Sequence, residues 1–175
     1  ADAYDRLIYA VLNDAGTAVD LYRLTPNGVY DATFGTGGKV TSALTSVSSA
    51  SQIRVALDSA NRIVVAATSS TANRFSVRAF NNGTSTTAGG NGAAIYAQLN
   101  ITALTNSPVV TGLIASADGN SLVLGTQSGT NGAWIARITS AGALDTTGFN
   151  AAGSPAGIFQ YSAGGGTTGQ IGRAH

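Results

Sequence analysis

The stretch at residues 75–80 reads Phe-Ser-Val-Arg-Ala-Phe and alternates apolar with polar side chains. A period of two places the two sets on opposite faces of a β-strand, and the Asn-Asn-Gly that follows is typical of a turn. Comparable short runs, each bounded by Asn, Asp, Gly or Ser, lie at 7–12, 53–57, 62–67, 121–125 and 133–138. No segment has a sustained helical period with caps. The sequence therefore predicts an all-β protein built from antiparallel sheets.

Three segments of the chain share one order of features. Each has a turn with Asp or Asn, an apolar strand, a polar turn, a strand that contains an Arg, and a turn that contains Gly. We take Arg23, Arg78 and Arg137 as the anchors of this repeat, which recurs at roughly 55 to 60 residues. The repeat predicts one β-repeat domain over 1–175, divided into units at 1–48, 49–106 and 107–169, with 170–175 beginning a further strand.

Residues 23–40 carry the fullest form of the repeat and read Arg-Leu-Thr-Pro-Asn-Gly-Val-Tyr-Asp-Ala-Thr-Phe-Gly-Thr-Gly-Gly-Lys-Val. The third copy matches this signature in part, and the second replaces it with a loop rich in Gly, Thr and Asn at 84–92. The signature closely resembles the consensus of the delta-60 repeat, a family with bacterial surface and secreted members. This resemblance covers nearly the whole chain. It implies propeller-like blades and an extracellular location, and it implies no reaction.

The signature residues suit turns rather than chemistry. Gly adopts positive φ in tight turns, a short carboxylate accepts backbone N–H bonds, and a Phe can pack a turn onto a sheet. The residues to which we assign these structural roles are Arg23, Asn27, Gly28, Asp31, Phe34, Gly35, Gly38, Arg78, Arg137, Gly142, Asp145 and Phe149.

The two ends of the chain fit each other as parts of one unit. The second and third units open with a strand, near 52–57 and 109–115, whereas the first unit begins directly at Leu7. The missing strand has a counterpart at the other end, where Gln170 and Ile171 begin a run like that at 52–57. This strand could close onto the same chain or complete a neighbouring subunit, since an unpaired edge can pair with another chain. We therefore expect Leu7, Gln170 and Ile171 to take part in a subunit contact.

The composition indicates an extracellular protein that binds neither nucleic acid nor a membrane interior. Charged residues make up 10% of the 175 residues, against roughly 25% in average proteins. The net charge of +1 is too small for a nucleic-acid footprint, and no apolar run is long enough to cross a membrane. The chain has no Cys and no Met. Ala1 is thus expected to be the mature end left by a signal peptide, or the boundary of a fragment.

The sequence offers little for catalysis, so we predict that the protein is not an enzyme. The single His is His175, at the end of the chain, where no rigid scaffold can hold it in a triad. The acidic residues are all Asp, and most precede turns. We expect no cofactor. Calcium stays open as an alternative because Asp and Asn oxygens are its ligands, although no Asp-x-Asp-x-Asp-Gly pattern occurs.

Two functions from different classes follow from these observations. The first is a non-enzymatic extracellular structural protein that polymerises with itself, as a filament, sheath or surface adhesin, by exchange of terminal strands. The second is a partial β-propeller that binds a glycan or a host surface through its aromatic residues, among them Trp134. We expect most of these aromatics to pack within or between sheets.

Overall fold

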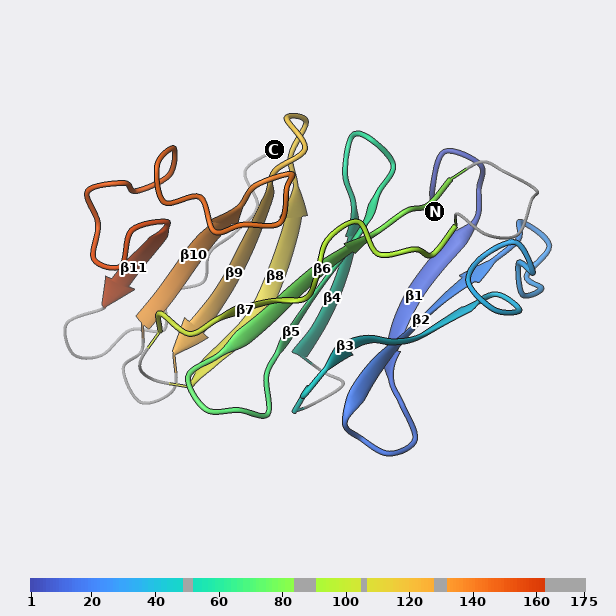
Figure 1. The fold of residues 1–175 in the computed structure, drawn as a ribbon, viewed down its shortest axis with the longest axis horizontal. Helices are drawn as coiled ribbons and strands as arrows, with labels where there is room; N and C mark the ends of the chain where they lie inside the picture. The colour runs from blue at the N-terminus through green and yellow to red at the C-terminus, as the bar shows by residue number, and fades with distance from the viewer. Residues whose placement is uncertain (49–51, 84–90, 105–106, 128–131, 163–175) are drawn as a thin grey trace.

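The computed structural model describes residues 1–48, 52–83, 91–104, 107–127 and 132–162 (Figure 1). Within these ranges the chain forms eleven β-strands and no helix. The strands pair antiparallel and group into three sheets. The prediction of an all-β chain of antiparallel sheets is confirmed.

Each sheet takes its strands from one part of the chain and keeps them in chain order. The first sheet consists of β1 (Leu7–Leu12), β2 (Ala18–Leu24) and β3 (Lys39–Thr45). The second consists of β4 (Ile53–Leu57), β5 (Ile63–Thr68), β6 (Phe75–Phe80) and β7 (Leu99–Ile101). The third consists of β8 (Pro108–Ala115), β9 (Ser121–Gln127), β10 (Gly132–Ile138) and β11 (Ile158–Ser162). The first sheet thus lacks a counterpart of β4 and β8 among the described residues.

Backbone hydrogen bonds after β2, β6 and β10 define which residues of the three sheets are equivalent. Asp31 N donates to Arg23 O, and Asp145 N donates to Arg137 O in the same way. In the second sheet the corresponding bond runs from Ile95 N to the carbonyl of Ala79. Ala79, rather than Arg78, therefore occupies the position of the two signature arginines. Residues 84–90 lack the signature sequence that would have revealed this register.

A second set of equivalent positions lies in the turn that precedes β1, β5 and β9, which we call the unit-opening turn. The same bond closes it three times, from Asp2 N to Arg6 O, from Asp58 N to Arg62 O and from Ser116 N to Asn120 O. The penultimate residue of each turn has positive φ, at Asp5, Asn61 and Gly119. Asn, Asp and Gly adopt this conformation most readily, so the local sequence suits the turn.

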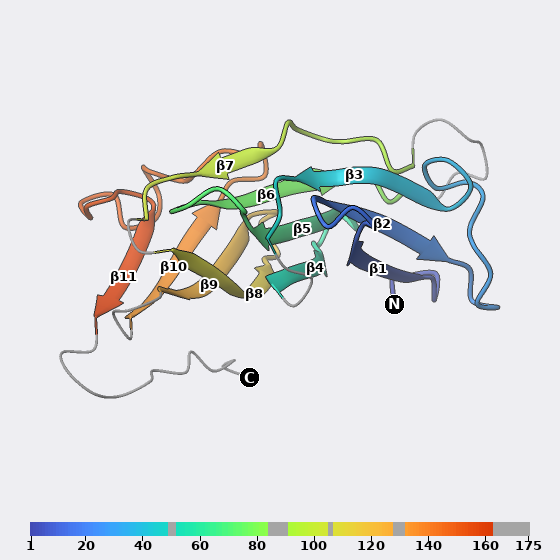
Figure 2. The ribbon, with the colours of Figure 1, turned by 90° about the horizontal axis from the view of Figure 1, so that it is seen from below.

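The three sheets stack face to face in chain order along the long axis of the molecule (Figures 1 and 2). We call the face that carries Arg23, Ala79 or Arg137 the forward face of its sheet, and the opposite face the rear face. The forward side chains of β2 share one core with the rear side chains of β5 and β6, such as Val19 with Phe80. The forward side chains of β6 share a second core with the rear side chains of β10, where Phe75 stacks on Trp134. At both internal interfaces, a forward face therefore meets the rear face of the next sheet.

This arrangement explains why β5 is apolar throughout. Its odd-numbered residues face the first sheet and its even-numbered residues face the third, so all six are buried. A strand covered on both faces loses the alternation of a half-exposed strand. The outer two sheets, in contrast, are covered on one face only by the described residues.

The ends of the predicted repeat are only partly described. Leu7 begins β1, as expected, whereas Gln170 and Ile171 lie outside the described residues. The described strands form neither a closed barrel nor a closed ring.

Candidate functional site

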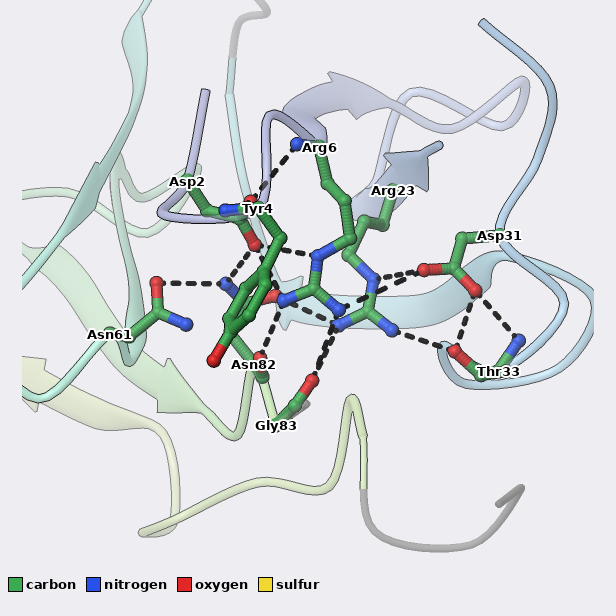
Figure 3. A network of polar contacts seen from close by, with 9 residues as sticks. All are labelled: Asp2, Tyr4, Arg6, Arg23, Asp31, Thr33, Asn61, Asn82 and Gly83. Atoms are coloured by element: carbon green, nitrogen blue, oxygen red, sulfur yellow. Dashed lines mark hydrogen bonds and ion pairs between the residues drawn. The ribbon is translucent and has the colours of Figure 1, made fainter. Parts of the chain in front are cut away.

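A network of buried polar side chains links the first sheet to the second (Figure 3). Arg23 is fully buried, and its guanidinium donates to Asp31 from Nε at 2.9 Å, to Thr33 from Nη2 at 3.0 Å and to Asn82 Oδ1 from Nη1 at 2.9 Å. Asp31 also caps the backbone amide of Thr33. The signature Arg and Asp thus hold the turn after β2 against its own strand, and Asn82 of the second sheet completes the contact.

The unit-opening turn of the first sheet supplies the other half of this network. Arg6 donates from Nε to Asp2 at 2.7 Å, and from Nη2 and Nη1 to the carbonyls of Asn82 and Gly83 at 3.1 Å each. Asn82 returns a hydrogen bond from Nδ2 to Asp2 at 2.9 Å. We call this arrangement, an Asp-buttressed Arg that binds carbonyls of the next sheet, the arginine clamp.

The arginine clamp recurs between the second and third sheets. Arg62 is held by Asp58 at 2.5 Å and donates from Nη1 to the carbonyl of Ser140 at 3.0 Å. Ser140 follows β10 at the position that Asn82 has after β6. In the third sheet the corresponding residues are Ser116 and Asn120, so the clamp is absent there.

The carboxylates of this network have lowered pKa values. Burial alone would raise the pKa of Asp2, but hydrogen bonds from the Arg6 side chain, the amides of Tyr4 and Arg6, and Asn82 lower it to about 2. Burial alone would also raise the pKa of Asp31, but hydrogen bonds from Thr33 and the charge of Arg23 lower it. Both groups are therefore held as carboxylates, which suits a structural ion pair and not a general acid.

The third sheet repeats the signature contact in a more open setting. Arg137 donates from Nε to Asp145 at 2.6 Å, and Asp145 caps the amide of Gly148 at 2.7 Å. The Gly148 amide bond and the Arg137 side chain lower the pKa of Asp145. The Arg137 side chain is 27% exposed, whereas that of Arg23 is fully buried. The difference arises because the forward face of the third sheet has no following sheet among the described residues.

The structure places the other signature residues in turns. Gly28, Gly35, Gly38 and Gly142 all have positive φ, and Asn27 precedes the first of them. Phe34 is fully buried beneath the Arg23 guanidinium, and Phe149 lies beneath that of Arg137 but is half-buried. Arg78 belongs to the rear face and reaches back to the carbonyl of Ala43 in the first sheet at 3.4 Å.

The forward face of the third sheet is open along its β11 edge, where it carries large apolar side chains. Tyr161 and Phe159 of β11 are 55% and 48% exposed. The equivalent residues of β7 are Leu99 and Ile101, because Ile101 pairs with Phe75 in the second sheet as Tyr161 pairs with Ala133 in the third. Ile101 is only 4% exposed. Both counterparts pack into the core between the second and third sheets. The third sheet therefore exposes positions that the second sheet buries.

The rear face of the first sheet is open in the same way. Leu7 is 50% exposed, whereas its counterpart Ile63 is fully buried against the first sheet. The rings of Tyr9 and Tyr22 stack at 5.0 Å, and Tyr30 lies 5.7 Å from Tyr22. Burial and a hydrogen bond to Tyr30 raise the pKa of Tyr9 to about 12. We call this surface the tyrosine face.

The remaining candidates for a site are metal-ligating side chains, a polar cleft, His175 and Trp134. The described residues contain no group of three or more His, Cys, Asp or Glu side chains that could hold a metal ion. A cleft of about 390 Å³ beside the β5–β6 turn is lined mainly by Ser and Thr residues, together with Asn73, Arg74 and Gln52, and by no carboxylate. His175 lies outside the described residues. Trp134 is fully buried against Phe75, so it cannot serve as an exposed sugar platform.

Sequence reasoning did not find the arginine clamp or the role of Asn82. The clamp has a signal in the sequence, which is an Asp followed four residues later by an Arg directly before a strand, at Asp2 and Arg6 and again at Asp58 and Arg62.

Comparison with known protein families, curated proteins and solved structures found no match for this chain. The resemblance to the delta-60 repeat therefore stays a prediction. No helix among the described residues has the length and apolar character to span a membrane.

Proposed function

We propose that this chain is a non-enzymatic structural protein of the cell exterior, whose propeller-like blades assemble with other copies of the chain into a filament, sheath or adhesin. One observation carries the proposal: the third sheet exposes Phe159 and Tyr161 at positions where the second sheet packs against its neighbour. Exposed apolar side chains that form a contiguous patch mark interaction sites.

The open edge of the first sheet supports the second part of the proposal, in which subunits exchange terminal strands. β1 pairs only with β2 among the described strands, whereas β5 and β9 have a strand on both sides. An unpaired edge presents free N–H and C=O groups that accept a further strand. The run that begins at Gln170 and Ile171 would occupy this edge in a neighbouring copy.

Assembly is tested by measuring the mass of the native protein in solution at rising concentration. We expect sedimentation or light scattering to detect species larger than the 17.4 kDa chain, and electron micrographs to show fibres or rings. A stable monomer at every concentration would refute the proposal. Removal of 170–175 separates its two parts, because it should weaken strand exchange and leave the sheet faces intact.

The tyrosine face favours a second candidate function, recognition of a glycan. Aromatic rings on an exposed sheet can stack on sugars, and Lys39 and Asp20 add polar groups beside Tyr22. A glycan array gives the test. Binding that Tyr22→Ala abolishes, while Trp134→Phe leaves it intact, would support this function. The absence of binding by a monomeric form would exclude it.

A further inference from the structure

We infer that the tyrosine face of one copy packs against the open forward face of the third sheet of another copy. This inference rests on the proposed self-assembly and specifies its interface. Successive copies would then continue the stack of sheets without a change of direction. Such a contact is head-to-tail, and it gives a ring or an open filament according to the rotation between copies.

The two internal interfaces supply the first argument. In both of them a forward face meets a rear face, and the same strand positions supply the core residues. The described part of the chain leaves one forward face and one rear face uncovered. The uncovered pair is therefore the same combination that the fold already uses twice, and each partner exposes apolar side chains at positions buried inside the stack.

The polar groups of the two faces supply the second argument. Inside the stack, Arg23 Nη1 leaves its own sheet to bind Asn82 and Gly83 of the next. The equivalent Arg137 contacts Asp145 through Nε and Nη2, and no bond from its Nη1 occurs among the described residues. In a following copy, the positions of Asn82 and Gly83 correspond to Pro26 and Asn27. Pro26 lacks the side-chain oxygen with which Asn82 accepts from Arg23, but the carbonyl of Asn27, at the position of Gly83, would accept from Arg137.

The repeat also fixes which residues would meet at this contact. In the second unit-opening turn, Ser59 Oγ donates to the carbonyl of Ala117 in the third, at 2.8 Å. Ala3 is the counterpart of both in the first turn. Residue 117 of one copy should therefore lie beside residue 3 of the next. Within one chain these two residues are separated by two sheet spacings, on the order of 20 Å.

Engineered cysteines test this register directly, because the chain contains no Cys of its own. Ala3 and Ala117 are exposed, so replacement by Cys should not disturb the fold. A disulfide needs Cα atoms within about 7 Å, which excludes a bond within one chain. We expect the double variant Ala3→Cys, Ala117→Cys to form a ladder of covalent oligomers under mild oxidation. Mixed single variants should give dimers that contain one copy of each.

The matched control places the first cysteine at the other end of β1. Ala15 is exposed in the β1–β2 turn, so Ala15→Cys with Ala117→Cys should give no ladder. If the wild-type chain assembles but the Ala3 and Ala117 pair does not cross-link, or the control links equally well, the inferred interface is wrong and self-assembly stands. If the wild-type chain is a monomer at every concentration, both fail.

Discussion

Arg23 shows how one residue can join two sheets. Burial of its guanidinium and the nearby charge of Arg6 lower the pKa of Arg23, whereas the carboxylate of Asp31 opposes this lowering. A buried charge of this kind tolerates the loss of a partner poorly, because the remaining partner stays desolvated. The equivalent Arg137 makes the same Asp contact with a partly exposed side chain. The two residues therefore form a natural comparison.

We predict that Arg23→Met destabilises the protein far more than Arg137→Met. The first substitution removes the Arg23 donor from the buried Asp31 and Asn82 side chains and leaves the Asp31 charge without its closest cation, which should cost about 3–5 kcal/mol. The second should cost much less, because the Arg137 side chain is already 27% exposed and Asp145 keeps its hydrogen bond from the Gly148 amide. Urea unfolding measures both losses of stability, at a protein concentration too low for assembly. Equal losses would show that burial does not govern the strength of these pairs.

The pH dependence of stability follows from the lowered pKa of Asp2. A carboxyl whose pKa is about 2 when folded and 3.8 ordinarily stabilises the fold above the latter value and loses this effect as pH falls toward 2. The shift corresponds to about 2 kcal/mol. We predict that Asp2→Asn lowers the free energy of unfolding at neutral pH and that its difference from wild type shrinks between pH 4 and pH 2. A difference that stays constant over this range would contradict the assignment.

Turns of the signature differ in how strictly they need glycine. Gly28 has a φ of 79° and no atom within 4 Å of the point where a Cβ would lie, whereas a Cβ on Gly35, with a φ of 55°, would lie 2.1 Å from the carbonyl oxygen of Lys39. We predict that Gly28→Ala costs about 1–2 kcal/mol, from backbone strain alone. Gly35→Ala should cost several times more, because backbone atoms must move. Thermal unfolding of the two variants gives the comparison, and a similar cost for both would refute it.

The element-level pattern explains what the sequence could and could not predict. Period-two alternation found β6 and β10, and the apolar run found β5, because their side chains are buried on one or both faces. It missed β11, a short strand whose forward residues, Phe159 and Tyr161, are exposed. The sequence places Arg78 at the anchor position because residues 84–90 lack the signature that would fix the register of the turn. That register depends on backbone bonds, which side-chain patterns do not report.

The candidate site needed the structure for a different reason. The Asp31 and Phe34 positions were predicted as turn-building residues within one unit, and the structure places both beside Arg23. Asn82 and Arg6 contact across units, at a sequence separation of more than seventy residues. No local pattern specifies such a contact. Only the stacking of one sheet on the next brings these residues together.

At the scale of the whole molecule, the absence of the arginine clamp in the third unit has a measurable consequence. Each internal interface has a clamp, from Arg6 or from Arg62, but the inferred contact between copies would have only Asn120 in its place. Contact between copies should therefore be weaker than contact within the chain. This weakness would let a chain fold before it assembles.

Restoring the clamp should strengthen the assembly. We predict that Ser116→Asp with Asn120→Arg lowers the concentration at half-assembly by roughly tenfold, since hydrogen bonds to a charged group are typically worth that much or more. The carbonyl of Pro26 in the next copy would be the acceptor, at the position that Ser140 has for Arg62.

Asn120→Arg alone is the control and should gain less, because no carboxylate orients the new guanidinium. Light scattering over a dilution series measures all three proteins. An unchanged midpoint in the double variant would mean that the third sheet does not meet the first sheet of another copy in the register of the internal stack.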